Sequence, residues 1–282
     1  MRQQLIVGMP SSGKSTFIAA LRHLLVADET ATALQLVKLS DEESHVNALE
    51  DEWLSCREIE RTKPATEGWV EFTVRNRKTG TESVLAIPDL RGETFEQPLC
   101  TGRCVKSLYE AVGNSDAILL FTNADRPDDA GLISDLNDMH ENRDTPDTAQ
   151  NNSKAAPRSQ FKPEDMPEEV KIIEFLQMAN RRPLQARRRR IGIVISAWDV
   201  VSSDVEPTQW FGEHRPMLDQ FLANNADLWE TRIYGVSAQG GKLPRDRERL
   251  TKIRKPSQRI ILVGDETLAH DLTSPLSWLG DM

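Results

Sequence analysis

The chain has 282 residues, 38% of them hydrophobic and 28% charged, which is enough to bury a core and remain soluble. A formal net charge of −9, from 35 basic and 44 acidic residues, argues against general binding to nucleic acid or to an anionic membrane. Local basic patches are still compatible with this balance.

Cysteine usage and hydropathy bear on where the protein works. Cys56, Cys100 and Cys104 have no histidine at zinc-ligand spacing, so we expect thiols in a reducing compartment. No cleavable apolar leader precedes the first predicted strand, and the longest apolar runs are far shorter than a membrane span. We therefore expect a cytoplasmic protein that does not enter the membrane.

Strands and helices alternate along the chain, which is the pattern of a parallel α/β sheet. Helices are predicted where apolar residues recur at helical spacing, and strands where short apolar runs lie between turn signals. In chain order the predicted elements are strand 4–8, helix 15–25, a helical stretch within 45–60, strands 69–74 and 82–89, helix 99–113, strand 117–124, helix 168–181, strand 191–199, helix 208–225, strand 232–238 and an edge strand 259–264. The two strands that flank RNRKTG predict an antiparallel hairpin with Gly80 in its turn.

We expect one domain over residues 1–282, with two unusual segments. Residues 125–166 are rich in Asp, Asn, Pro, Ser and Thr and poor in large apolar side chains. Such a segment buries too little to offset the entropy of ordering, so we expect a polar, partly disordered insertion. Residues 240–282 form an atypical C-terminal extension, in which RIILVG and PLSWL replace an amphipathic closing helix.

The stretch LIVGMPSSGKSTF, near the start of the chain, predicts a phosphate-binding loop between a strand and a helix. Glycines allow positive φ and close backbone approach, so successive N–H groups converge on phosphate oxygens. Lys14 can reach the β- and γ-phosphates, and Ser15 can offer its hydroxyl to Mg²⁺. The residues expected to bind the nucleotide phosphates are Gly8, Ser11, Ser12, Gly13, Lys14, Ser15 and Thr16.

A second loop, within LAIPDLRGE, places Asp89 at the end of a predicted strand, where a carboxylate could hold Mg²⁺. Gly92 can bring its backbone N–H near a γ-phosphate. Before the hairpin, Thr66 is favoured over Thr62 as the residue that closes over Mg²⁺ and the γ-phosphate. Arg61 is a candidate cation for the transition state, with an exposed loop charge as the alternative.

A third pair of loops indicates which base is bound. Asp199, at the end of VISAWD, can accept hydrogen bonds from guanine N1–H and its 2-amino group together. Adenine has an acceptor at N1 and lacks the 2-amino donor, so this carboxylate disfavours it. Ser237 and Ala238 end the next predicted strand, and Ala238 could present its N–H to guanine O6. Ser196 opens the same base-reading motif.

In this order, GMPSSGKS, a switch threonine, DLRG, SAWD and VSA resemble the motifs of Ras-like, translation-factor-type GTPases. Together with the terminal DLTSPLSWLG, they resemble the bacterial double-GTPases of conflict, or anti-phage, systems. The resemblance implies a single three-layer P-loop GTPase domain of α/β class, with a mostly parallel sheet, one antiparallel edge hairpin and a polar insertion. It also implies GTP, GDP and Mg²⁺ as ligands, and partner proteins of a defence complex, such as a second GTPase.

Two loops depart from that pattern. Ala197 stands where common GTPases have a lysine, and Trp198 either stacks on the base or points into the core. Glu93 replaces a water-orienting glutamine, which predicts slow hydrolysis unless a partner completes the site. The run ARRRR is interpreted as a solvated helix end rather than a nucleic-acid contact.

Two other functions compete with a hydrolysing GTP switch. Glu93 favours a scaffold that binds nucleotide without hydrolysing it. A P-loop ATPase is the other alternative, and Asp199 with VSA counts against it. Binding of a non-hydrolysable GTP analogue separates the switch from the scaffold by whether partner affinity changes, and competition between GTP and ATP tests the ATPase alternative.

Overall fold

The computed structural model describes residues 2–39, 44–59, 70–87, 93–126 and 166–281. Its strands are β1 (Arg2–Gly8), β2 (Leu34–Leu39), β3 (Val70–Asn76), β4 (Glu82–Ile87), β5 (Ala117–Asn123), β6 (Arg189–Ser196), β7 (Trp229–Ser237) and β8 (Ile261–Val263). Its helices are α1 (Lys14–Ala27), α2 (Ser44–Leu54), α3 (Glu93–Thr101), α4 (Lys106–Asn114), α6 (Glu168–Ala179), α7 (Pro207–His214), α8 (Pro216–Asn224), α9 (Arg247–Thr251) and α10 (Thr273–Gly280). Two short 3₁₀ helices are η2 (Trp198–Val200) and η3 (Pro256–Arg259). The predicted α/β alternation is confirmed.

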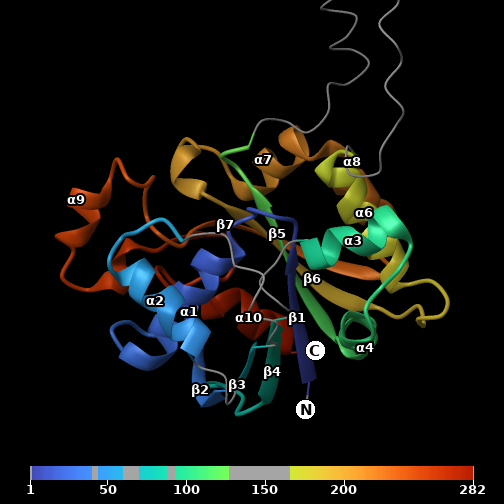
Figure 1. Ribbon diagram of the computed structural model, residues 1–282, viewed down its shortest axis with the longest axis horizontal. Coiled ribbons are helices and arrows are strands. Elements are labelled where there is room, and N and C mark those ends of the chain that lie inside the picture. Colours follow the sequence, from blue (N-terminus) through green and yellow to red (C-terminus); the bar gives the residue numbers. More distant parts are fainter. Residues whose placement is uncertain (1, 40–43, 60–69, 88–92, 127–165, 282) are drawn as a thin grey trace, which may run out of the picture.

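The strands form one sheet in the order β2-β3-β4-β1-β5-β6-β7-β8 (Figure 1). Its centre is parallel, because β1 pairs in parallel with β4 and β5, and β6 pairs in parallel with β5 and β7. The predicted β3–β4 hairpin is confirmed as antiparallel, with Gly80 at φ 74° in its turn. β8 pairs antiparallel with β7, as expected for an edge strand. All the parallel strands therefore end at one edge of the sheet.

β2 was not predicted, and it adds a further antiparallel strand beyond the hairpin. It lies at the end of the sheet, and Leu34 is its one buried residue. A register shift between Leu36 and Lys38 interrupts its pairing with β3. Its burial does not alternate along the strand, so the sequence pattern that marks a half-buried strand is weak here.

Two helices predicted as continuous are broken, and these predictions were wrong. The stretch 99–113 divides between α3 and α4 at Gly102, which has φ 67°. The stretch 208–225 divides between α7 and α8 at Arg215, directly before Pro216. The buried Arg215 guanidinium donates to Thr122 Oγ1 at 3.1 Å and to the Asn123 carbonyl at 3.2 Å. Tertiary contacts with β5 thus fix a turn that helical periodicity does not reveal.

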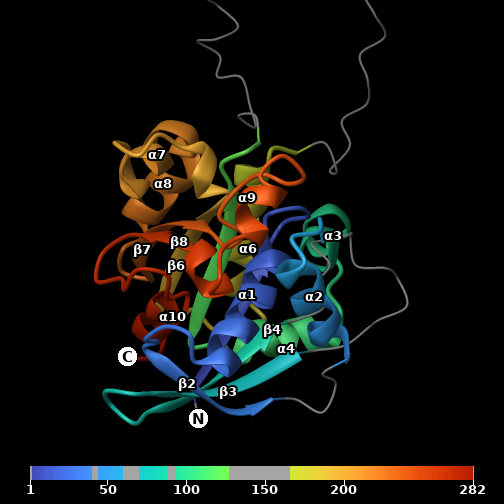
Figure 2. The ribbon, with the colours of Figure 1, turned by 90° about the vertical axis from the view of Figure 1, so that its left-hand side faces the viewer.

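Helices cover both faces of the sheet and complete three layers. Leu5 and Ile6, neighbours in β1, belong to different buried clusters because successive strand residues face opposite sides. α1, α2 and α10 lie on one side, and α3, α4, α6 and α8 on the other (Figures 1 and 2). α10 contains PLSWL and contacts β1 and β5, so this segment packs on the sheet as expected.

The ARRRR run is not a solvated helix end, and that interpretation was wrong. Arg189 is the first residue of β6 and is only 1% exposed. It donates to the carbonyls of Ser115 (3.1 Å) and Ala179 (3.3 Å), at the C-terminal ends of α4 and α6. Arg187 donates to the Gly113 carbonyl at 3.0 Å. These guanidinium groups therefore satisfy carbonyls that helix ends leave without partners. Burial lowers the pKa of Arg189 to about 10, so it remains charged at neutral pH.

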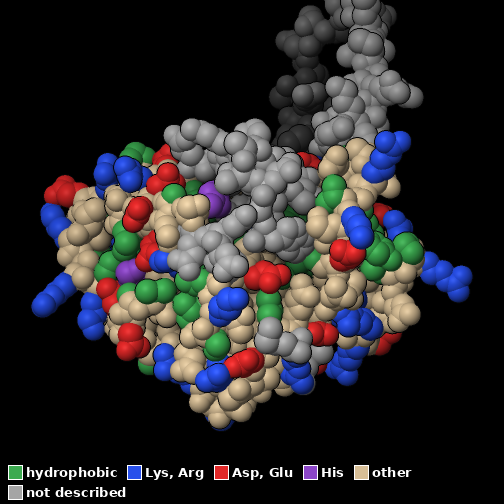
Figure 3. Space-filling model, turned by 60° about the horizontal axis from the view of Figure 1, so that its bottom comes forward, with side chains coloured by type: hydrophobic (Ala, Val, Ile, Leu, Met, Phe, Trp, Pro, Cys, Tyr) green, Lys and Arg blue, Asp and Glu red, His purple; other side chains and the backbone are tan. Residues whose placement is uncertain are grey.

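Charged side chains and thiols in the described part of the chain can be compared with the patterns of metal clusters and membrane spans. Acidic and basic side chains are interspersed on the face in Figure 3. Cys56 is buried and Cys104 is exposed; Cys100 lies in α3 and Cys104 beyond its end, so the two do not share a helix. Among the described side chains, no three His, Cys, Asp or Glu residues gather as metal ligands do. No helix in those ranges has the length and apolar composition needed to cross a bilayer.

Candidate nucleotide-binding site

Both glycines of the predicted phosphate loop are required by close packing. A Cβ on Gly8 would lie 2.6 Å from Ser12 Oγ and 2.8 Å from Phe121 Cβ. A Cβ on Gly13 would lie 2.7 Å from Ser196 Cβ, and Gly13 has φ 90°, a left-handed conformation at the start of α1. The loop between β1 and α1 thus lies tightly against the ends of β5 and β6.

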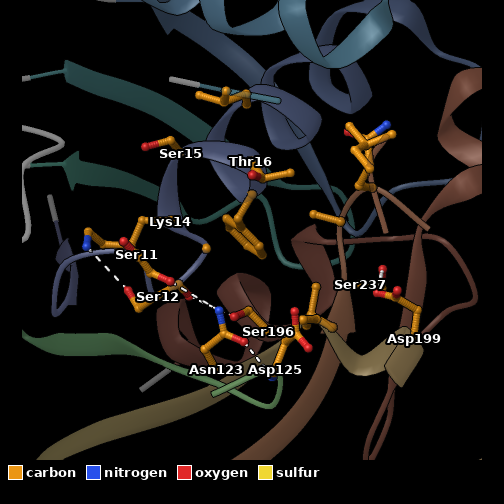
Figure 4. Close-up of a pocket in the computed structure, with 18 of the residues that line it drawn as sticks. Ser11, Ser12, Lys14, Ser15, Thr16, Asn123, Asp125, Ser196, Asp199 and Ser237 are labelled. Carbon is orange, nitrogen blue, oxygen red and sulfur yellow. Dashed lines mark hydrogen bonds between the residues drawn. The ribbon is translucent and has the colours of Figure 1, made fainter. Parts of the chain in front are cut away.

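Three successive carbonyls of this loop each accept a hydrogen bond from a side chain at or just beyond the end of β5, or at the end of β6. The Pro10 carbonyl accepts from Arg126 and the Ser12 carbonyl from Ser196 at 2.8 Å, while the Ser11 carbonyl accepts from Asn123 at 3.1 Å (Figure 4). The C=O and N–H of a trans peptide point in opposite directions, so the next N–H after each carbonyl is turned away from these side chains. The Ser12 N–H donates within the loop to the Met9 carbonyl at 3.3 Å, and the orientation of the peptide groups is otherwise compatible with an anion cradle.

Lys14 holds its ammonium group inside the loop. Its Nζ donates to the carbonyls of Gly8 (2.6 Å) and Met9 (3.0 Å) and to Ser12 Oγ (3.3 Å). The residue is only 4% exposed, yet it lines the cavity described below. A positive charge is therefore fixed beside the loop at the N-terminus of α1, where the helix dipole also favours an anion.

Ser15 and Thr16 leave α1 in opposite directions, with Thr16 on the side of Asp199 and Ser237 (Figure 4). Both line the cavity. A serine hydroxyl beside phosphate oxygens fits Mg²⁺, which prefers oxygen ligands and retains water and phosphate in its shell. The other residues predicted for metal binding, switching or catalysis, namely Arg61, Thr62, Thr66, Asp89 and Gly92, lie outside the described residues, as does the side chain of Glu93.

Asp199 does not end a strand as predicted, because β6 stops at Ser196 and Asp199 lies in η2. Ala197, with φ 55°, makes the bend between them. The Ser237 hydroxyl donates to Asp199 Oδ1 and accepts the Gly240 N–H at 3.0 Å. Because the Ser237 oxygen accepts a hydrogen bond from the Gly240 N–H, its own hydroxyl hydrogen is directed at the Asp199 carboxylate.

Ala238 is supported from behind by α2 and by the C-terminal extension. Its carbonyl accepts the Trp53 indole N–H at 3.0 Å, and Trp53 is fully buried. The Arg259 guanidinium lies 4.4 Å from the centre of the Trp53 ring and donates to Cys56 Sγ at 2.6 Å. Residues far apart in sequence therefore position the loop after β7.

Trp198 points into the core, which decides between the two predicted orientations. It is only 5% exposed, and its ring meets Trp210 edge-on at 6.4 Å. A Cβ on Gly235 would lie 2.3 Å from the Trp198 ring, so β7 packs directly on the indole. Trp198 is thus unable to stack on a base as it lies here.

One cavity of about 540 Å³ joins the phosphate loop to the Asp199 loop. It is lined by nearly all the described residues predicted to bind nucleotide: Ser11, Ser12, Gly13, Lys14, Ser15, Thr16, Ser196, Asp199, Ser237 and Ala238. Gly8 is absent from the lining and instead supports the loop from β1. Ser196 has its hydroxyl committed to the carbonyls of Ser12 and Thr122, so it positions the loop.

Other lining residues were not predicted. They lie at or beyond the ends of β5, β7 and α2, and include Asn123, Asp125, Gln239, Lys242, Leu243, Arg57, Glu58 and Ile59. Their position was the available signal, because ligands of open α/β sheets bind beyond the carboxyl ends of the parallel strands. Nothing in their residue types alone distinguishes them from ordinary loop residues.

The chain is similar in structure to several distant GTPase domains. The GTPase-like domain of S. cerevisiae Ski7 bound to GTP is 14% identical, with a TM-score of 0.44 over 85% of this chain and 43% of that one. A bacterial selenocysteine-specific elongation factor, EF-Sec, is 12% identical, with a TM-score of 0.34 over 89% of this chain and 28% of that one. The G domain of the T. maritima FeoB iron transporter is 10% identical, with a TM-score of 0.31 over 88% of this chain and 95% of that one. The chain spans less than half of the first two. Likenesses this distant assign no activity.

The amino-acid sequence itself assigns the chain to a family. No curated protein matches the chain significantly. The family model described as Double-GTPase 1 matches residues 5–279, and so includes the phosphate loop, the Asp199 loop and the closing helix α10. Because the match extends over almost the whole length, the chain belongs to the Double-GTPase 1 family.

Proposed function

We propose that this protein is a GTP-binding and GTP-hydrolysing molecular switch. The observation that carries the proposal is the single cavity in which the phosphate loop and the Asp199 carboxylate lie at different ends. Membership of the Double-GTPase 1 family supports guanine nucleotide as the ligand. The proposed role is control of a bacterial anti-phage defence complex through nucleotide-dependent partner binding, and it rests on the resemblance to conflict-system GTPases.

At the phosphate end, Lys14 and the N-terminus of α1 would stabilise the negative charge of the β- and γ-phosphates. Ser15 would hold Mg²⁺ through its hydroxyl, and Asp89 is the carboxylate expected to complete that site. The metal would neutralise charge that develops on the phosphate oxygens. Hydrolysis is the addition of water at the γ-phosphorus with departure of GDP.

At the base end, Asp199 would accept from guanine N1–H and the 2-amino group, while Ser237 keeps the carboxylate oriented. A carboxylate has no donor for adenine N1, and adenine has no 2-amino group, so the edge of ATP would offer Asp199 neither of the two donors that guanine provides. Ala238, with its carbonyl already held by Trp53, would present its N–H to guanine O6.

Thr66 and Gly92 would sense the γ-phosphate and change partner affinity when it is lost. Arg61 would supply a cation to the transition state, and Glu93 beside the γ-phosphate would keep intrinsic hydrolysis slow. Single-turnover hydrolysis of GTP, with and without a candidate partner, tests this part. Turnover of several per second by the isolated chain would contradict the need for a partner, and no hydrolysis under any condition would favour the scaffold.

Nucleotide selectivity is the test of the main proposal. Titration calorimetry with GDP, GTP and ATP, each with Mg²⁺, should show guanine preference in the wild type. Asp199→Asn should weaken GDP binding by about 30- to 100-fold, the effect of losing charge-assisted hydrogen bonds worth about 2–3 kcal/mol. The amide of Asn can donate to the 2-oxo group of xanthine, so affinity for xanthosine diphosphate should rise.

Asp204→Asn is the matched control, because Asp204 lies in the loop after η2, is not among the residues that line the cavity and pairs with Ser202. It should bind GDP as the wild type does. Equal ATP and GTP affinity that Asp199→Asn leaves unchanged would overturn the GTPase proposal in favour of an ATPase.

A further inference from the structure

An ion pair crosses the base end of the cavity. Lys242 Nζ lies 2.8 Å from Asp125 Oδ2 and 3.1 Å from Oδ1, although the residues are 117 positions apart. Both line the cavity, and about half of each side chain is exposed (53% for Lys242 and 44% for Asp125). The contact therefore lies at the mouth of the nucleotide site and not on an unrelated surface.

Strand order fixes what this ion pair passes over. Asp125 follows β5 and Lys242 follows β7, and β6 lies between those two strands. Two strand spacings are about 10 Å, which a lysine side chain and an aspartate side chain can bridge together. Ala197, which bends the chain at the end of β6, lines the same cavity as Asp125 and Lys242, so we infer that the bridge spans this strand end. Ala197 itself offers a single methyl group there, and the neighbouring indole is buried in the core.

Both ends of the bridge are held in place. The backbone N–H of Lys242 donates to Asp246 Oδ2 at 2.9 Å, and the backbone N–H of Asp246 donates to the Lys242 carbonyl at 2.9 Å. On the other side, the Asp125 N–H donates to Asn123 Oδ1 at 2.7 Å, and Asn123 donates to the Ser11 carbonyl. Figure 4 shows Asn123 and Asp125 beside the phosphate loop. The bridge therefore links the loop after β7 to the phosphate loop.

We propose that the aliphatic stem of Lys242 forms one wall of the base pocket and packs on the purine ring. The proposal rests on the proposed function, because it assumes a guanine nucleotide in the cavity. Lysine buries its methylene groups against apolar or aromatic surface while its ammonium group is neutralised at the rim. Packing on the face of the ring does not depend on which hydrogen-bonding groups the base presents to Asp199. Lys242 thus contributes affinity, and Asp199 contributes selectivity.

Two substitutions of Lys242 distinguish the contribution of its charge to GDP binding from that of its aliphatic stem. Lys242→Ala removes the stem and should weaken GDP binding by about 5- to 30-fold. Lys242→Met keeps an apolar stem of similar length without the charge, and should remain within about threefold of the wild type. Lys252→Ala is the matched control, because Lys252 also forms an ion pair, with Glu248, but does not line the cavity.

Two further measurements test whether the Lys242 contact depends on the identity of the base and whether a second lysine can replace it. Calorimetry with inosine diphosphate, which lacks the 2-amino group, should show the same fold loss in Lys242→Ala as GDP does. Adding Ala197→Lys to Lys242→Ala should restore most of the lost affinity, because a stem then returns over the same strand end. Wild-type affinity in Lys242→Ala, or equal losses in Lys242→Ala and Lys242→Met, would overturn this inference alone. A wild type that binds no guanine nucleotide would overturn the proposed function as well.

Discussion

Ser237 donates its hydroxyl hydrogen to Asp199, which lies 38 residues earlier in the chain. The two residues meet because β6 and β7 are parallel neighbours whose ends reach the same edge of the sheet. The Gly240 N–H, 3.0 Å from the serine oxygen, sets the direction of the donated proton. The carboxylate proposed to select guanine is thereby oriented by the fold itself, which lowers the cost of ordering it on binding.

Replacement of Ser237 by alanine should weaken GDP binding by about 5- to 20-fold, since one hydrogen bond to a charged group is worth roughly 1.5 kcal/mol. Titration calorimetry measures the change. Ser202→Ala is the control, because Ser202 makes a similar hydroxyl contact to Asp204 on the exposed surface. Unchanged GDP affinity in Ser237→Ala would show that the carboxylate needs no such support.

Gly13→Ala should destabilise the fold by about 2–4 kcal/mol, from positive-φ strain and from the clash with Ser196. Gly80→Ala is a matched comparison, since Gly80 also has positive φ but a Cβ there would meet nothing within 4 Å. It should cost only about 1 kcal/mol. Urea unfolding of both variants separates backbone strain from close packing, and equal losses would argue against the clash.

Arg189→Ala should lower the free energy of unfolding by about 3 kcal/mol, because buried carbonyls at the ends of α4 and α6 lose their donor. The neighbouring Arg188→Ala removes the same charge from a side chain that is mostly exposed and pairs with Glu230. That variant should stay within about 0.5 kcal/mol of the wild type. Denaturant unfolding provides both values, and a small effect at Arg189 would contradict its role as a helix cap.

Acidification should weaken the contact between α1 and α2 at Glu50. Burial by itself would raise the pKa of Glu50, but the hydrogen bond from His23 and the charge of Arg22 lower it overall from its ordinary value of 4.5. A lowered folded-state pKa gives stability that is present above pH 4.5 and is lost as the pH falls through the folded value.

The stability difference between wild type and Glu50→Gln should therefore be full at neutral pH and shrink below pH 4.5. Urea unfolding at pH 7 and at successively lower pH values measures it. Glu248→Gln, which removes an exposed carboxylate from the pair with Lys252, corrects for general effects of charge. A difference that does not change with pH would contradict the proposed ion pairing.

The sequence was most informative where function depends on contiguous residues. The phosphate loop could be predicted because Gly8 to Ser15 lie on one strand–loop–helix unit, with each residue type required locally. Strands with strong apolar runs, such as β5 and β6, were predicted for the same reason. α10 could be placed only as a packing segment, since its partners β1 and β5 are distant in sequence.

Other features depend on which strands become neighbours, and no local pattern reveals that. Asn123 and Lys242 have ordinary loop chemistry until β5, β6 and β7 bring them to one cavity. The break between α7 and α8 depends on Arg215, which reaches Thr122 across the core. Trp198 was ambiguous because its burial is decided by Gly235 on the next strand.

The ion pair between Arg126 and Glu168 bears on how the domain tolerates changes in chain length. Arg126 directly precedes residues 127–165, and Glu168 comes three residues after them. Arg126 also donates a hydrogen bond to the Pro10 carbonyl of the phosphate loop. With both ends fastened together, the entropic cost of joining them changes only slowly with the number of residues between them. Changes in the length of the chain between Arg126 and Glu168 should therefore cost the domain little stability. Whatever sequence is grafted there stays anchored to the phosphate loop.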